Sequence, residues 1–143
     1  MKKLILVLLI VVQACMAFAQ NFSVDEPVYA SVDIPPHYLN GGDKGLLSDL
    51  YTIISETAPV SQDSVKGRAA VSFAVSKDGQ IDTGSIKVIR NRSVPDDYLK
   101  AAIEAIKKLG KFEPGKQLGT PKRVTYTIPV IYPAPPEYIK TNE

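Results

Sequence analysis

The most regular hydrophobic pattern lies near the C-terminal end of the chain. Between residues 124 and 132, apolar side chains occupy alternate positions, namely Val124, Tyr126, Ile128, Val130 and Tyr132. This period of two predicts a β-strand with one buried face. The strand also contains Pro129, which has no N–H to give to a neighbouring strand. We therefore expect it at an edge of its sheet or beside a bulge, and an edge is a place where another chain can pair.

Two earlier segments alternate in the same way. Residues 67–76 form the first predicted strand, and residues 80–90 form the second, after the turn signal Lys77-Asp78-Gly79. The apolar face of the second strand changes parity between Ile81 and Ile86. Gly84 is the expected site of a bulge that restores the pattern.

Two further segments have the period of amphipathic helices. The first covers about residues 43–56, with Asp43 as its N-cap. The second begins with Ser93 as N-cap and Pro95 in its first turn, and Gly110 is expected to cap its end. The order of elements is therefore helix, strand, strand, helix, strand.

This order predicts an α+β fold. A single helix connects the second strand to the third, so the third strand is expected to lie antiparallel beside the first. The prediction is a three-stranded antiparallel sheet in the order 2-1-3, with two helices packed on one face. The strand with Pro129 is then an edge strand.

The first nineteen residues have the features of a signal peptide. Lys2 and Lys3 precede an apolar run, and Ala17-Phe18-Ala19 is a small-x-small cleavage site before Gln20. One alternative is a membrane anchor, although a helix from residue 4 to 19 would span only ~24 Å of the ~30 Å hydrocarbon core. Another is a lipoprotein acylated at Cys15, for which the Gln two positions earlier is a poor fit.

Four parts are predicted along the chain. They are a signal peptide at residues 1–19, an extended leader at residues 20–36, a domain at residues 37–132 and a Pro-rich tail at residues 133–143. The leader is interpreted as a tether or an edge segment. The tail is expected to be extended and solvated, with partner binding as the alternative.

Charge and cysteine content bear on which classes of function and site are expected. Without Lys2 and Lys3, the chain has 15 basic and 15 acidic residues. Its net charge is therefore near zero and gives no indication of nucleic-acid binding. Cys15 is the only cysteine and leaves with the signal peptide, which excludes a disulfide and a thiolate site in the mature chain. His37 is the only histidine and lies in a Pro-rich stretch. We predict no enzyme, metal site, cofactor or small-molecule substrate.

Several short motifs occur together between residues 67 and 132. After a Val-x-Phe-x-Val strand and Lys-Asp-Gly come aromatic-x-Pro-Gly, Gly-x-Pro and Tyr-x-Ile-Pro-Val, and the motif residues include Gly79, Phe112, Pro114, Gly115, Gly119, Pro121 and Pro129. This stretch resembles the periplasmic C-terminal domain of TonB and TonB-like proteins, and residues 36–50 resemble its first helix and the segment before it. The chain departs from the energy transducers of the family at its N-terminal end, where residues 20–32 leave no evident Pro-rich rod.

The resemblance implies a protein partner and a place for it. In this family the edge of the last strand pairs with a short extended segment, the TonB box, of a TonB-dependent outer-membrane receptor. The partner-binding residues implied here are Arg123, Val124, Thr125, Tyr126, Thr127, Ile128 and Val130. The alternative is that Pro129 only protects the edge against aggregation.

Three hypotheses of function remain. The first is a non-enzymatic periplasmic TonB C-terminal-like module that binds a receptor segment by strand addition. The second is a membrane-anchored TonB energy transducer that acts in receptor-driven transmembrane transport. The third is a homodimer that joins two such edges.

Overall fold

The computed structural model describes residues 27–57 and 65–139. The predicted signal peptide, its cleavage site and Cys15 lie outside these residues. Within them, no helix has both the length and the apolar character needed to cross a membrane.

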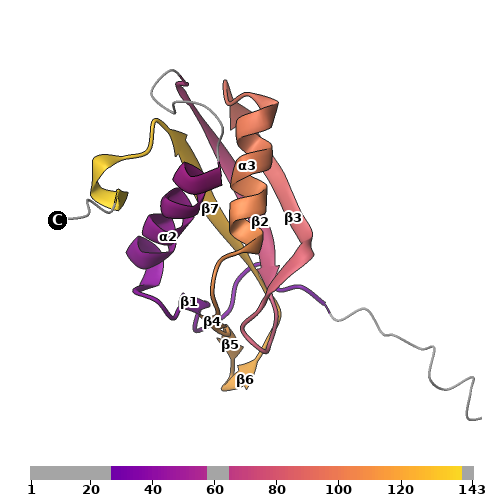
Figure 1. Ribbon diagram of the computed structural model, residues 1–143. Helices are drawn as coiled ribbons and strands as arrows, with labels where there is room; N and C mark the ends of the chain where they lie inside the picture. The colour runs from indigo at the N-terminus through magenta and orange to yellow at the C-terminus, as the bar shows by residue number, and fades with distance from the viewer. Residues whose placement is uncertain (1–26, 58–64, 140–143) are drawn as a thin grey trace, which may run out of the picture.

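A three-stranded sheet with two helices on one of its faces forms the centre of the molecule (Figure 1). The sheet contains β2 (Gly67–Val75), β3 (Ile81–Arg92) and β7 (Val124–Tyr132) in the antiparallel order β3-β2-β7. The helices are α2 (Gly42–Thr57) and α3 (Asp96–Lys107). This architecture confirms the predicted α+β fold, the strand order and the edge position of the strand with Pro129.

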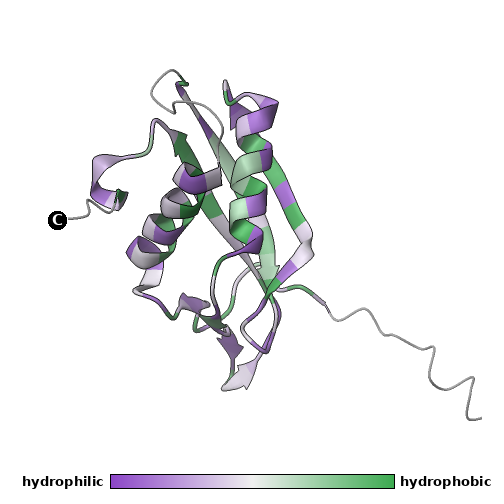
Figure 2. Ribbon diagram, viewed as in Figure 1, coloured by the Kyte–Doolittle hydropathy of each residue, from purple (hydrophilic) through white to green (hydrophobic). Residues whose placement is uncertain are grey.

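Short elements complete the chain. The two-residue strands β1 (His37–Tyr38) and β4 (Phe112–Glu113) pair with each other, as do β5 (Lys116–Gln117) and β6 (Thr120–Pro121). Residues Pro136–Tyr138 form the 3₁₀ helix η3. Figure 2 shows that polar and apolar residues share each helix, whereas β2 is largely apolar, because the central strand of the sheet is the most enclosed.

The pairing of β2 with β7 is continuous. It runs from Gly67 opposite Tyr132 to Val75 opposite Val124 without a register shift. In β7 the even-numbered residues face the helices and the odd-numbered ones face the other side of the sheet. The predicted alternation of this strand is therefore confirmed.

The pairing of β2 with β3 contains two irregularities. One lies between the pairs Ser72–Lys87 and Ala74–Asp82 and includes Gly84, as predicted. At this bulge the hydroxyl of Ser85 accepts the N–H of Ala74 at 2.8 Å. The second, between the pairs Ala70–Arg90 and Val71–Val88, has no counterpart in the prediction.

The caps of α3 differ from the prediction. The N-cap is Pro95 and not Ser93, because Asn91 forms a local turn in which its amide bonds both the N–H and the C=O of Val94. The C-cap is Lys108 and not Gly110. The N–H of Gly110 instead donates to the Tyr38 hydroxyl at 3.1 Å.

The described part of the C-terminal tail is docked, whereas the prediction was an extended and solvated tail. The ring of Tyr138 in η3 stacks on Tyr51 of α2, with 6.0 Å between ring centroids. Tyr51 is buried and Tyr138 is half-buried. An aromatic side chain that packs on a helix favours a docked segment over a solvated one, so residues 133–139 fold back on α2.

Aromatic rings fill the core beneath β7. Phe112 contacts Tyr38, Phe73 and Tyr126, with ring centroids 5.1, 6.1 and 5.2 Å away. The motif aromatic before Pro-Gly therefore joins β1, β2 and β7. Such edge-to-face contacts add stability beyond the area that they bury.

The two motif glycines with positive φ offer a stability test. Gly79 (φ 80°) and Gly119 (φ 78°) both have backbone conformations that side chains disfavour. A Cβ at Gly79 would lie 2.0 Å from the Phe112 carbonyl oxygen, whereas one at Gly119 would meet nothing within 4 Å. We expect Gly119→Ala to lower the free energy of unfolding by ~1–2 kcal/mol and Gly79→Ala by a further ~1–3 kcal/mol. Urea unfolding followed by circular dichroism measures both, and equal losses would contradict the steric argument.

Candidate protein-binding edge

β7 has an outer edge, because only one of its sides pairs with β2. Backbone groups alternate in direction along a strand. The N–H of Thr125 points outward and donates to the Tyr29 carbonyl at 2.9 Å, and the N–H of Ile131 points outward and donates to the Tyr51 hydroxyl at 2.9 Å. The outer edge of β7 therefore consists of the backbone groups of Thr125, Thr127, Pro129 and Ile131, preceded by the carbonyl of Arg123.

Most donors of the outer edge are unavailable. Tyr29 takes the N–H of Thr125, Tyr51 takes that of Ile131, and Pro129 has none. Among the β7 residues, only Thr127 has an outward N–H for which residues 27–57 and 65–139 provide no acceptor. Its own carbonyl and that of Thr125 point the same way. One open position thus lies in the middle of an otherwise closed edge.

The seven residues predicted to bind a partner have different surroundings. The side chains of Val124, Ile128 and Val130 are buried in the core, and that of Tyr126 is half-buried. Arg123 forms an ion pair with Asp82 of β3. Only the side chains of Thr125 and Thr127 are exposed among the seven.

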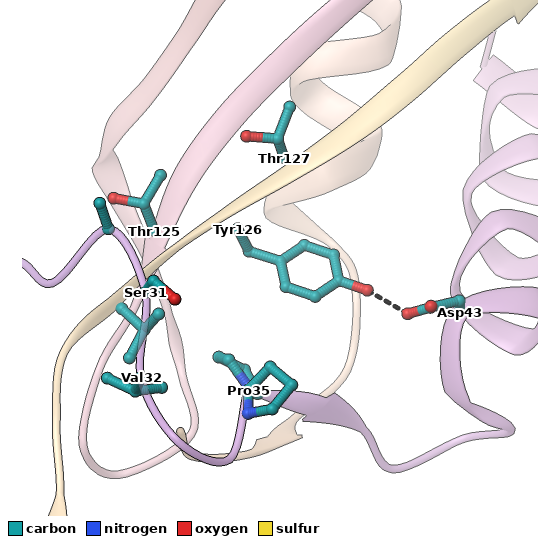
Figure 3. Close-up of a pocket in the computed structure, with 10 residues that line it drawn as sticks. Ser31, Val32, Pro35, Asp43, Thr125, Tyr126 and Thr127 are labelled. Carbon is teal, nitrogen blue, oxygen red and sulfur yellow. Dashed lines mark hydrogen bonds between the residues drawn. The ribbon is translucent and has the colours of Figure 1, made fainter. Parts of the chain in front are cut away.

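A pocket of about 460 Å³ lies beside the open position (Figure 3). One wall is β7 from Val124 to Thr127, and the other is the leader between Ala30 and Pro36. Asp43, at the start of α2, closes one side. Apolar and polar groups both line this space.

Gly115 holds the leader close to β7. A Cβ at this position would lie 2.7 Å from a methyl carbon of Val124, 3.1 Å from Pro36 and 3.2 Å from Val32. Only a residue without a side chain lets the three segments meet. This contact explains the glycine of the aromatic-x-Pro-Gly motif.

Four residues that the prediction did not place at the edge help to define it. Tyr29 and Tyr51 occupy donors of the outer edge, Val32 lines the pocket, and Asp43 was predicted only as a helix cap. Asp43 lies in the first turn of α2, which begins at Gly42. Of the predicted leader, Tyr29 pairs with the edge of β7, whereas Ile34 pairs with Lys116 of β5.

The described part of the chain has no metal-binding cluster at this edge. Residues 27–57 and 65–139 contain no group of three or more His, Cys, Asp or Glu side chains that could hold a metal ion. His37 is exposed in β1.

Tyr126 connects the pocket to α2. Its hydroxyl donates to the Asp43 carboxylate (Figure 3). Burial, the hydrogen bond to Asp43 and the negative charge of that carboxylate, in this order of importance, raise the pKa of Tyr126 well above its usual value of 10. The neutral phenol is therefore the form that the folded chain favours.

This preference predicts a stability loss in alkaline solution. The unfolded phenol ionises near pH 10, at which the folded one stays neutral, so the contribution of Tyr126 is complete below pH 10 and declines as the pH rises further. Urea unfolding at pH 8 and pH 11 should show a smaller loss in Tyr126→Phe than in the unaltered chain. Other buried tyrosines, such as Tyr132 with its pKa raised to about 12, act alike in both chains. An identical loss in both would contradict the inferred role of Tyr126.

Comparisons with known proteins found one family model and two solved structures similar to this chain. Residues 61–133 match the family model described as Gram-negative bacterial TonB protein C-terminal. Two NMR solution structures of the Helicobacter pylori TonB C-terminal domain are similar to the chain. One has 26% identity and a TM-score of 0.40, and the matched region covers 66% of this chain and 86% of the Helicobacter pylori chain. The other has 28% identity and a TM-score of 0.42, and covers 61% and 91%.

No curated protein matches the chain. The family match nevertheless covers more than half of the 143 residues and includes β2, β3, α3 and β7. These are the elements that build the sheet and its outer edge. The chain belongs to the TonB C-terminal domain family.

Proposed function

We propose that this chain is a non-enzymatic periplasmic module that binds an extended segment of an outer-membrane receptor, similar to a TonB box, by strand addition to the outer edge of β7. The observation that carries the proposal is the open position at Thr127, flanked by outward carbonyl groups and by the pocket. An added strand would satisfy these groups.

The family supports the class of partner. TonB C-terminal domains are transport-associated, non-enzymatic domains of the cell envelope that in general interact with outer-membrane receptors. The mode of binding proposed here comes from β7 itself, because an edge strand with unpaired backbone groups is a template for another strand.

The partner-binding residues have two kinds of role in this proposal. The backbone of Arg123, Thr125 and Thr127 forms the ladder with the partner, and the exposed hydroxyls of Thr125 and Thr127 lie beside its side chains. Val124, Tyr126, Ile128 and Val130 anchor β7 to the core and hold the edge in place. A rigid edge lowers the entropy that is lost on binding.

The N-terminal segment sets the location in this proposal. Cleavage before Gln20 gives a mature chain that starts with the leader and is free of the inner membrane. Such a chain would bind a receptor segment without transmitting force to it.

A single substitution tests the proposal. Thr127→Pro removes the open N–H, and the neighbouring Pro129 shows that β7 accepts proline at an outward-facing position. We expect loss of binding to a synthetic peptide with the periplasmic N-terminal segment of a TonB-dependent receptor of the same cell. Isothermal titration calorimetry measures the dissociation constant.

Two variants serve as controls. Thr127→Val has a similar shape and keeps the N–H, so it should retain most of the affinity, and Lys108→Ala alters a remote exposed residue. Circular dichroism establishes that all variants are folded. Equal affinities for Thr127→Pro and both controls would overturn strand addition at this edge.

A further inference from the structure

We infer that the leader is an internal competitor of the partner: Tyr29 occupies the first part of the outer edge of β7, and the partner gains this part only when Tyr29 leaves. This inference rests on the proposed function and concerns the regulation of the same site. It follows from the hydrogen bonds of the described part of the leader, residues 27–36.

Tyr29 has the bonding pattern of a strand residue added to β7. Its N–H donates to the Arg123 carbonyl at 2.8 Å, and its carbonyl accepts the Thr125 N–H at 2.9 Å. The bridge to Val124 is parallel. The Lys122 ammonium lies 5.6 Å from the centre of the Tyr29 ring, a cation–π contact that adds to the backbone bonds. Tyr29 of the same chain thus makes the first pair of backbone hydrogen bonds along this edge, which we call the first rung.

The leader leaves β7 directly after this rung. A parallel ladder would continue with Ser31 between the Thr125 carbonyl and the Thr127 N–H. No such bonds form in the described part of the chain, and Ser31 and Val32 line the pocket instead (Figure 3). The leader therefore occupies one rung and leaves the next one open.

A second anchor fixes the leader beyond the point at which it leaves β7. Ile34 and Lys116 exchange backbone hydrogen bonds of 3.0 and 2.8 Å. The Asp33 carboxylate accepts the Leu118 N–H, and the Asp33 N–H donates to the Gln117 side chain, both at 3.0 Å. Because this anchor does not involve β7, Tyr29 can detach while Ile34 stays in place. A competitor tethered in this way acts at high effective concentration.

Displacement of Tyr29 increases the number of β7 backbone groups that can bond a partner strand. With Tyr29 bound, and within residues 27–57 and 65–139, β7 offers an incoming strand one N–H, that of Thr127, because Pro129 and Ile131 contribute no open donor. Departure of Tyr29 returns the Thr125 N–H and the Arg123 carbonyl to the edge. The partner then gains two adjacent rungs, and its apparent affinity depends on the fraction of chains with the leader released.

The test compares Tyr29→Pro with Tyr29→Phe in the mature chain. Proline removes the N–H that bonds Arg123, whereas phenylalanine keeps the backbone bonds and the ring. We expect the Thr125 amide hydrogen to exchange at least about tenfold faster in Tyr29→Pro. The receptor peptide should also bind this variant about tenfold more tightly. Tyr29→Phe should behave as the unaltered chain in both measurements.

A second variant guards against an effect particular to proline. Asp33→Ala removes the acceptor of the Leu118 N–H and should shift both measurements in the same direction by a smaller factor. Unchanged exchange at Thr125 in Tyr29→Pro would overturn the inference, and so would faster exchange with unchanged or weaker peptide binding. If the peptide binds no chain at all, the proposed function fails. Faster exchange would then still support the leader as an occupant of the edge.

Discussion

The uninterrupted pairing of β2 with β7 is the contact on which the rest of the structure depends. Its register decides which side chains of β7 enter the core and which backbone groups face outward. A shift by one residue would expose Ile128 and Val130 and turn Thr127 inward. Pro129 fits this register because its nitrogen lies on the side away from β2, where no ladder bond is lost. The core and the outer edge are therefore two results of one register.

The two edge strands of the sheet, β3 and β7, differ in how their outer backbone groups are protected. β3 is exposed, has two irregularities, and carries Lys87, Arg90 and Arg92, features that discourage another strand. On β7, Tyr29 and Tyr51 occupy the two ends of the outer edge and Pro129 interrupts it. Among the residues that the structure describes, Thr127 alone in β7 has an outward N–H without a protein acceptor. In the proposed function, a partner strand pairs with this open donor and displaces Tyr29.

Periodic segments could be predicted from the sequence, and irregular ones could not. The alternation of β2 and β7, the bulge at Gly84 and the edge position of Pro129 follow from local pattern and from the missing N–H of proline. The contacts of Tyr29 with β7 and of Tyr51 with Ile131 join segments that are far apart in the sequence and have no period to reveal them. The N-cap of α3 was missed because Ser93 has suitable chemistry but the local turn formed by Asn91 displaced it.

The proposed function depends on the addition of a partner strand to β7 at Thr127. Titration of the ¹⁵N-labelled mature chain with the receptor peptide, followed by NMR, tests it most directly, because a new hydrogen bond shifts the resonance of the amide proton that donates it. We expect the largest shift at Thr127, a change at Thr125 as its acceptor changes from Tyr29 to the partner, and little change along β3. Shifts concentrated on β3 or on the exposed sides of the helices, with Thr127 unaffected, would contradict it.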